Sequence, residues 1–429
     1  MKHFIITLLL VFAGGTTQAA FFDPADLSQA YTYLNQIRDR AGMTGFSQNS
    51  QLEAAAFNHA NYLADNFMIG HYETEGTPGF TGIQVRERAI FTGYRSLSVS
   101  ENVSSGDDTG IKSIDSLMSA IYHRFGFLSF DKNEVGIGIG KVLEPSPYNV
   151  YVYNMGNVGL NTLCDGPAFS GFGRYYYEVC KPDIKIDATD FENVQEQIQN
   201  NNPSIVLWPT DGDNDVPPVF FEESPDPLPD YTVSGYPISI QFNPSVFSDV
   251  NVTKFKIYRD SDNLEIQNTR LLTESSDPNK KFSTLEYALF PLERLDWNTA
   301  YRAEAEYTTS SGTNLLIWRF KTKGVGVPLY TVKNEGEILS IPSTTSALAV
   351  YMVPTASFSE MNRISYRYSG GMTLETDFID GNTTLKIGLS GRVGDEAAFT
   401  LTDATLGGER HFTIKITADA VEPTTIVVV

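Results

Sequence analysis

Basic residues are scarce in this chain. Lys and Arg together number 31 against 52 Asp and Glu, so 429 residues carry a formal net charge of −21. Such an acidic surface repels nucleic acids and anionic membranes, and it favours solubility or the binding of cations. We therefore expect no nucleic-acid partner.

Long apolar runs are also missing, except at the very start. The first residues, MKHFIITLLLVFAGGTTQA, combine a charged beginning, an apolar centre and small residues at the end, which is typical of a secretory signal peptide at residues 1–19. No later run approaches the roughly 18 apolar residues that a membrane helix needs. The sequence thus predicts a secreted, extracellular or periplasmic protein without a transmembrane segment.

Cysteine occurs only twice, at Cys164 and Cys180. In the oxidising compartment that an export signal implies, such a pair can persist as a disulfide. Closing a loop of about 15 residues would contribute roughly 3 kcal/mol in the chain-entropy model. The alternative is a free, nucleophilic thiol.

Two common hydrolase signatures are absent, the Gly-x-Ser-x-Gly elbow and the His-Glu-x-x-His pair. The stretch GIGIG at residues 136–140 superficially resembles a nucleotide-binding loop. Because it lacks the strand-turn-helix setting of such a loop, we interpret it as a strand whose small residues permit close packing.

Helical periodicity is concentrated near the expected mature start. Asp23 and Pro24 predict the beginning of a helix that ends near Gly42, and a second helix spans the apolar positions from Leu52 to Phe67. A third helix is expected to end near His123. These helices and two following strands, EVGIGIGK and NVYVYNMGN, predict an α+β domain.

The rest of the chain consists mainly of short strands separated by turn residues, as in immunoglobulin-like or fibronectin-like β-sandwiches. A segment dense in Pro and Asp precedes them. The predicted order is a signal peptide (1–19), an α+β domain (27–160), an extension with the Cys164–Cys180 disulfide (161–203), a Pro/Asp-rich linker (204–232), a β-sandwich (233–325) and a second β-rich module (327–429).

Histidine is rare, and the α+β domain holds most of it. Of five histidines, His59, His71 and His123 lie in this domain. His71 follows a glycine after the second helix, Glu101 stands in the motif Ser-Glu-Asn, and His123 stands in a His-Arg pair.

This order of motifs, Gly-His, GIQVRERAIFTGY, SEN, HR and GIGIG, resembles a bacterial, multidomain member of the CAP superfamily. That superfamily contains the SCP-like domain shared by cysteine-rich secretory proteins, antigen 5 and pathogenesis-related proteins. The resemblance covers about a third of the chain. It implies an α-β-α sandwich with a central cleft, into which two His and two Glu project in the fuller members.

The resemblance places His71 and His123 at the two histidine positions and Glu101 at the first glutamate. The second glutamate is missing, because Ala120 stands at its position and Leu117 replaces the tryptophan that normally precedes it. Asp115 lies on a different helical face from Ala120, so whether it compensates stays open.

Two imidazoles and a carboxylate are suitable ligands for a divalent cation such as Zn²⁺. We therefore expect His71, Glu101 and His123 to bind a cation or small ligand, and they are also the candidate catalytic residues. The β modules would act as spacers or as docking surfaces for a polymer or a surface protein. The alternatives are a metal-dependent hydrolase of peptide, lipid or cell-wall material, with Glu101 as base, an adhesin-like structural protein with a vestigial cleft, and a cleft that Glu101 merely organises through hydrogen bonds.

Overall fold

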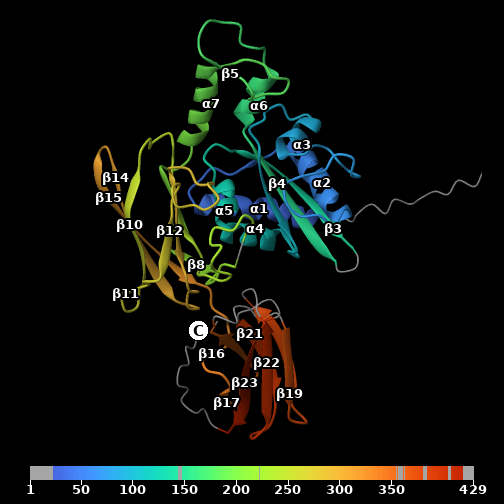
Figure 1. Ribbon diagram of the computed structural model, residues 1–429, viewed down its shortest axis with the longest axis vertical. Helices are drawn as coiled ribbons and strands as arrows, with labels where there is room; N and C mark the ends of the chain where they lie inside the picture. The colour runs from blue at the N-terminus through green and yellow to red at the C-terminus, as the bar shows by residue number, and fades with distance from the viewer. Residues whose placement is uncertain are drawn as a thin grey trace, which may run out of the picture.

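The chain folds into a mixed α/β domain followed by two β-sandwiches, as Figure 1 shows for the computed structural model. This arrangement confirms the predicted fold class. The structure describes residues 23–143, 147–221, 223–353, 355, 361, 363–379, 384–403 and 407–418. The expected signal peptide lies outside the described residues. None of the described helices is long and apolar enough to cross a membrane.

A four-stranded sheet forms the centre of the N-terminal domain, with the strand order β1-β3-β4-β2. Its two long central strands are the antiparallel pair that the sequence predicts. The fourth strand contains the Ser-Glu-Asn motif, which places Glu101 and Asn102 on opposite faces of the sheet. The strands are β1 (Ser47–Gln48), β2 (Ser100–Ser105), β3 (Glu134–Val142) and β4 (Tyr148–Gly156).

Helices cover both faces of this sheet. Helix α2 (Ser50–Asp65) packs on one face, and α1 (Pro24–Arg40) and α4 (Gly110–Ser119) pack on the other. The predicted N-cap is confirmed, because the Asp23 carboxylate accepts hydrogen bonds from Ala25 N and Asp26 N. A short helix that the periodicity did not reveal, α3 (Val85–Phe91), carries Arg88.

Close packing explains the GIGIG strand. A Cβ atom on Gly136 would lie 2.0 Å from Glu53 N, and one on Gly138 would lie 2.2 Å from Ala56 C. The backbone of α2 therefore rests directly on β3, which only glycine permits at these positions. The interpretation of GIGIG as a packed strand is confirmed.

The third predicted helix is interrupted. Ala120 has an extended conformation (φ −76°, ψ 114°), so α4 ends at Ser119 and a separate helix, α5 (Ile121–Phe127), begins after it. The Glu223 carboxylate accepts a hydrogen bond from Ile121 N (2.5 Å) and stabilises the new start. His123 therefore lies in the first turn of α5 rather than at the end of a long helix.

The extension behind the domain contains the predicted disulfide between Cys164 and Cys180. The disulfide ties α6 (Val158–Asp165) to the returning chain, and no described cysteine is free. The remaining elements of the extension are β5 (Tyr175–Tyr176), β6 (Ile186–Asp187) and α7 (Ala188–Asn200).

The first sandwich contains a five-stranded sheet, β11-β10-β14-β15-β8, and a four-stranded sheet, β12-β13-β9-β7. Its strands begin earlier than predicted, because β7 and β8 lie in the segment 204–232 and pair with β9 and β15. Much of the expected linker thus belongs to the sandwich. The strands are β7 (Ile205–Trp208), β8 (Asp213–Val216), β9 (Ile238–Phe242), β10 (Asn251–Arg259), β11 (Leu264–Glu265), β12 (Thr269–Leu272), β13 (Glu286–Pro291), β14 (Ala300–Thr309) and β15 (Gly312–Thr322).

The second sandwich has two four-stranded sheets, β16-β18-β21-β20 and β17-β23-β22-β19, around an apolar core of its own. Figure 1 shows it in orange and red, at the bottom of the view. Its strands are β16 (Leu329–Val332), β17 (Glu337–Pro342), β18 (Ala347–Met352), β19 (Arg363–Tyr368), β20 (Thr373–Ile379), β21 (Thr384–Ser390), β22 (Glu396–Asp403) and β23 (Gly408–Thr417).

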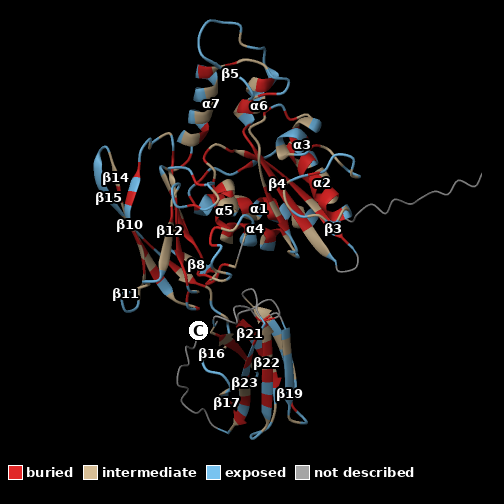
Figure 2. Ribbon diagram, viewed as in Figure 1, coloured by how far each residue is buried: buried red, intermediate tan, exposed pale blue. Residues whose placement is uncertain are grey.

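The N-terminal domain and the first sandwich share one apolar core. A single cluster of buried side chains contains Leu34 and Met118 of the domain as well as Trp208 and Ile240 of the sandwich. Figure 2 shows buried residues on both sides of this junction. Because removing apolar surface from water is the main stabilising contribution to folding, we expect these two parts to be held rigidly together.

Candidate functional site

The structure brings the three predicted site residues to one place beside the sheet. His71 Nδ1 lies 3.0 Å from Glu101 Oε1, and the rings of His71 and His123 stack with centroids 6.2 Å apart. Glu101 comes from β2, His123 from α5, and His71 from the loop after α2. The sheet thus holds the carboxylate between segments far apart in sequence.

Glu101 is buried against Arg88. The guanidinium donates hydrogen bonds from Nη2 to both carboxylate oxygens, at 2.8 and 2.7 Å, and both side chains are almost inaccessible to solvent. Burial alone would raise the pKa of Glu101, but the His71 hydrogen bond and the Arg88 charge outweigh it and hold the pKa below its usual value. Glu101 is therefore ionised and already engaged as an acceptor.

Arg88 also fixes His71, because Nη1 donates to the His71 carbonyl oxygen at 3.1 Å. Arg88 thus pairs with the Glu101 carboxylate and with the His71 backbone. The Arg124 guanidinium instead donates to carbonyl oxygens of Met118 and Pro237.

His59 lies behind the site and is fully buried. Its Nδ1 is 2.9 Å from Glu73 Oε1 and its Nε2 is 3.2 Å from the Gly70 carbonyl oxygen. Both ring nitrogens are therefore used in hydrogen bonds. We therefore interpret His59 as a hydrogen-bonded structural histidine rather than a ligand.

His123 has an acidic partner that the sequence did not reveal. Its Nδ1 lies 2.9 Å from Oε2 of Glu223, a residue of the predicted linker 100 positions away. Burial raises the pKa of Glu223, and the hydrogen bond with His123 offsets this only in part. Nothing in the local pattern around Glu223 marks it, since only the docking of the following sandwich brings it to the cleft.

Neither Ala120 nor Asp115 provides the carboxylate that contacts His123. Ala120 is the extended residue between α4 and α5, and its side chain has no ligand atom. The carboxylate of Asp115 instead accepts a hydrogen bond from Tyr33 in α1 at 2.5 Å. Asp115 is thus occupied by a contact between helices, on a different helical face.

The two site histidines have the same arrangement. Each presents Nδ1 to a carboxylate, and neither Nε2 has a hydrogen-bond partner within the described part of the chain. A carboxylate on one ring nitrogen fixes the tautomer and leaves the other nitrogen as a ligand atom. Each ring therefore keeps Nε2 as its remaining ligand atom. No group of three or more His, Cys, Asp or Glu in the described ranges is arranged to hold a metal.

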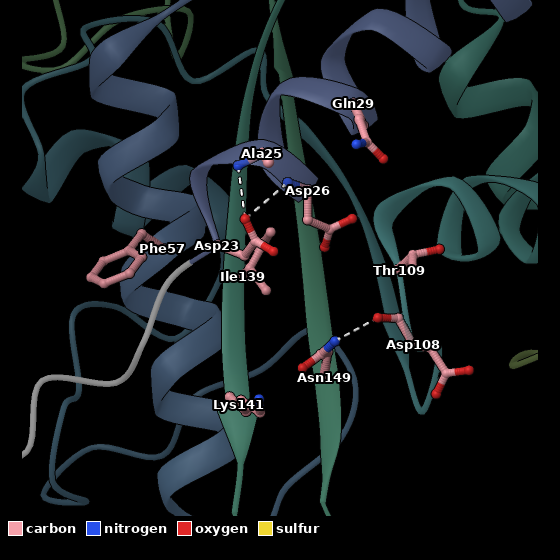
Figure 3. A pocket seen from close by; sticks show the side chains of 10 residues that line it. All are labelled: Asp23, Ala25, Asp26, Gln29, Phe57, Asp108, Thr109, Ile139, Lys141 and Asn149. Atoms are coloured by element: carbon pink, nitrogen blue, oxygen red, sulfur yellow. Dashed lines mark hydrogen bonds between the residues drawn. The ribbon is translucent and has the colours of Figure 1, made fainter.

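A separate pocket of about 290 Å³ lies at the beginning of α1 and contains none of these residues. Figure 3 shows Asp23, Asp26 and Asp108 at its edges. The carboxylates of Asp23 and Asp26 accept hydrogen bonds from the backbone of the domain, including Gly110 N (2.8 Å). We therefore interpret them as structural.

Comparison with known proteins identifies the domain. Residues 31–153 match the model of the Cysteine-rich secretory protein family, CAP. The N-terminal domain is a CAP domain. No curated protein matches this chain.

Several solved structures match parts of this chain. An extracellular SCP-domain protein from Bacillus anthracis is 20% identical, with 30% of this chain and 40% of that chain covered and a TM-score of 0.26. An outer surface protein from Borrelia burgdorferi is 17% identical, with 32% of this chain and 96% of that chain covered and a TM-score of 0.27. The titin Ig tandem domains A164–A165 are 12% identical, with 48% of this chain and 92% of that chain covered and a TM-score of 0.17.

Sequence reasoning found His71, Glu101 and His123 of this cleft. It missed Glu223, which lies outside the residues that match the family. It also left the role of Arg88 open, although Arg88 makes the closest charged contact with Glu101.

Proposed function

We propose that this protein is exported and that its CAP domain binds a divalent cation such as Zn²⁺ through Nε2 of His71 and Nε2 of His123. The observation that carries the proposal is that two imidazole rings with centroids 6.2 Å apart each place Nδ1 against a carboxylate, which leaves both Nε2 atoms as possible ligands. Neutral imidazole is a common ligand for Zn²⁺. A bound cation would supply a Lewis acid that holds a small anionic or polar ligand in the cleft.

The accessibility of the two rings supports this role. The His71 side chain is 39% exposed, whereas that of His123 is 12% exposed. A cation can therefore reach the pair from solvent while one ligand remains shielded. Glu101 would orient His71 rather than bind the cation itself, because both of its carboxylate oxygens accept hydrogen bonds from Arg88.

Binding is favoured over hydrolysis by the state of Glu101. A general base needs a pKa near the working pH, whereas Arg88 and His71 hold the pKa of Glu101 low. The β-sandwiches would serve as spacers or as docking surfaces for a polymer or a surface protein.

Isothermal titration of the full chain with Zn²⁺ tests the proposal. We expect one binding event in the parent protein that is lost in His71→Ala combined with His123→Ala. His411→Ala is the matched control, because His411 also faces a glutamate, Glu335, but lies on the surface of the second sandwich. Unchanged Zn²⁺ binding in the double variant would contradict the proposal.

A further inference from the structure

The second acid of the cleft comes from outside the CAP domain. Glu223 lies in the connection between β8 and β9 of the first sandwich, and it is nearly inaccessible to solvent. Its carboxylate accepts hydrogen bonds from Ile121 N (2.5 Å) and from Tyr122 N (3.3 Å), and it faces His123 Nδ1 at 2.9 Å. One side chain thus holds both the start of α5 and the ring of His123.

Neighbouring contacts lock this segment to the sandwich. Tyr122 donates its hydroxyl hydrogen to the carboxylate of Asp277 and accepts from Asn279 Nδ2 at 2.9 Å. The same Asn279 Nδ2 donates to the Asp226 carbonyl oxygen at 2.6 Å. Asn279, a residue of the sandwich, therefore contacts both helix α5 and the segment that carries Glu223.

Arg124, the next residue of α5, adds a third contact. Its Nη1 donates to the Pro237 carbonyl oxygen at 2.7 Å and to Ser239 Oγ at 3.1 Å. Three consecutive residues, Tyr122, His123 and Arg124, therefore contact the part of the chain that follows the CAP domain. The position of the His123 ring depends on the docked sandwich.

We infer that Glu223 is a positioning residue of the cation site, supplied by the module that follows the CAP domain in place of an acid on the domain's own helix. The inference rests on the proposed function. As an acceptor for Nδ1–H, Glu223 keeps the hydrogen on Nδ1 of His123 and leaves Nε2 free to bind the cation. The site is then complete only when the first sandwich is docked, so the two events are thermodynamically coupled.

The test combines Zn²⁺ titration with ¹⁵N NMR of the histidine rings, on the full chain. We expect Glu223→Ala to weaken Zn²⁺ binding about 10- to 100-fold, as the loss of comparable partners of metal ligands does. In the protein without metal, it should also shift the His123 hydrogen from Nδ1 toward Nε2. Glu223→Gln keeps an acceptor oxygen and should restore the Nδ1–H tautomer, which a purely structural role does not predict.

The control is Glu274→Gln, which removes the same charge from an exposed position of the same sandwich. Circular dichroism and the melting temperature show whether each variant is folded. If Glu223→Ala is not folded, Glu223→Leu, which fills the same space without an acceptor atom, takes its place. An unchanged His123 tautomer in folded Glu223→Ala, or Zn²⁺ affinity within about twofold of the parent, would overturn the inference. If the parent binds no Zn²⁺, the proposed function fails, and the tautomer alone decides whether Glu223 positions His123.

Discussion

Arg88 and Glu101 form a buried ion pair in which Nη2 donates to both carboxylate oxygens, at 2.8 and 2.7 Å. Removing the guanidinium would leave an uncompensated charge inside the domain. We expect Arg88→Met to lower the free energy of unfolding by about 3–5 kcal/mol, the usual effect of breaking a buried pair. Urea denaturation measures this change. Arg86→Met, at an exposed position of the same helix, should change stability by less than about 0.5 kcal/mol, and an equally small effect of Arg88→Met would contradict this account of the cleft.

The close contact between β3 and α2 predicts a steric effect at Gly138. A Cβ there would lie 2.2 Å from the backbone of Ala56, so α2 would have to move. Gly138→Ala should destabilise the protein by about 1–3 kcal/mol, as overpacking does. Gly370→Ala is the control, since nothing lies within 4 Å of the added atom. Equal melting temperatures for the two variants would contradict the packing described here.

The contact of Asp277 with Tyr122 should make the stability of the junction depend on pH. Burial tends to raise the pKa of Asp277, but the Tyr122 hydroxyl and the backbone N–H groups of residues 279, 281 and 282 outweigh it and lower the pKa. Because the folded-state pKa of Asp277 lies below its ordinary value of 3.8, this stabilisation is present above pH 3.8. It is lost as the pH falls through the lower, folded-state pKa.

Asp277→Asn should therefore be less stable than the parent at neutral pH, and the difference should shrink below about pH 3.8. Urea denaturation between pH 2.5 and 7 measures it, with the exposed Asp249→Asn as the control. A difference that stays constant over this range would show that ionisation of Asp277 does not stabilise the junction.

The coupling between the sandwich and the cleft predicts an effect at a distance. Asn279 has no hydrogen bond with His123 or Glu223 in the described structure, yet it links Tyr122 to the Asp226 carbonyl oxygen. Asn279→Ala should loosen the segment that carries Glu223 and weaken Zn²⁺ binding several-fold, within the range of coupling between distinct sites. The measurement is Zn²⁺ titration, with Asn214→Ala, an exposed amide elsewhere in the sandwich, as the control. Equal affinities would argue against the coupling.

Much of the CAP domain could be predicted from sequence because its signals are local. The N-cap at Asp23, the apolar period of α2 and the small residues of GIGIG each depend on neighbours within a few positions. The order of short motifs then predicted one cleft with His71, Glu101 and His123, and in the structure His71 lies within hydrogen-bond distance of Glu101.

The parts that could not be predicted depend on tertiary contacts. The helix that begins after Ala120 is stabilised by Glu223, which accepts the Ile121 N–H group from about 100 positions away. The segment 204–232 is rich in Pro and Asp, yet β7 and β8 gain partners from distant strands of the sandwich. Local composition indicated a linker because it contains no information about which strands will pair.

The most direct test of the central claim is anomalous diffraction at the zinc absorption edge, from crystals of the full chain soaked in Zn²⁺. The account predicts one strong peak within bonding distance of Nε2 of both His71 and His123. It also predicts that the peak disappears in crystals of the His71→Ala and His123→Ala double variant. Absence of a peak between the two rings in the parent crystals, or a peak only at a surface pair such as His411 and Glu335, would contradict it.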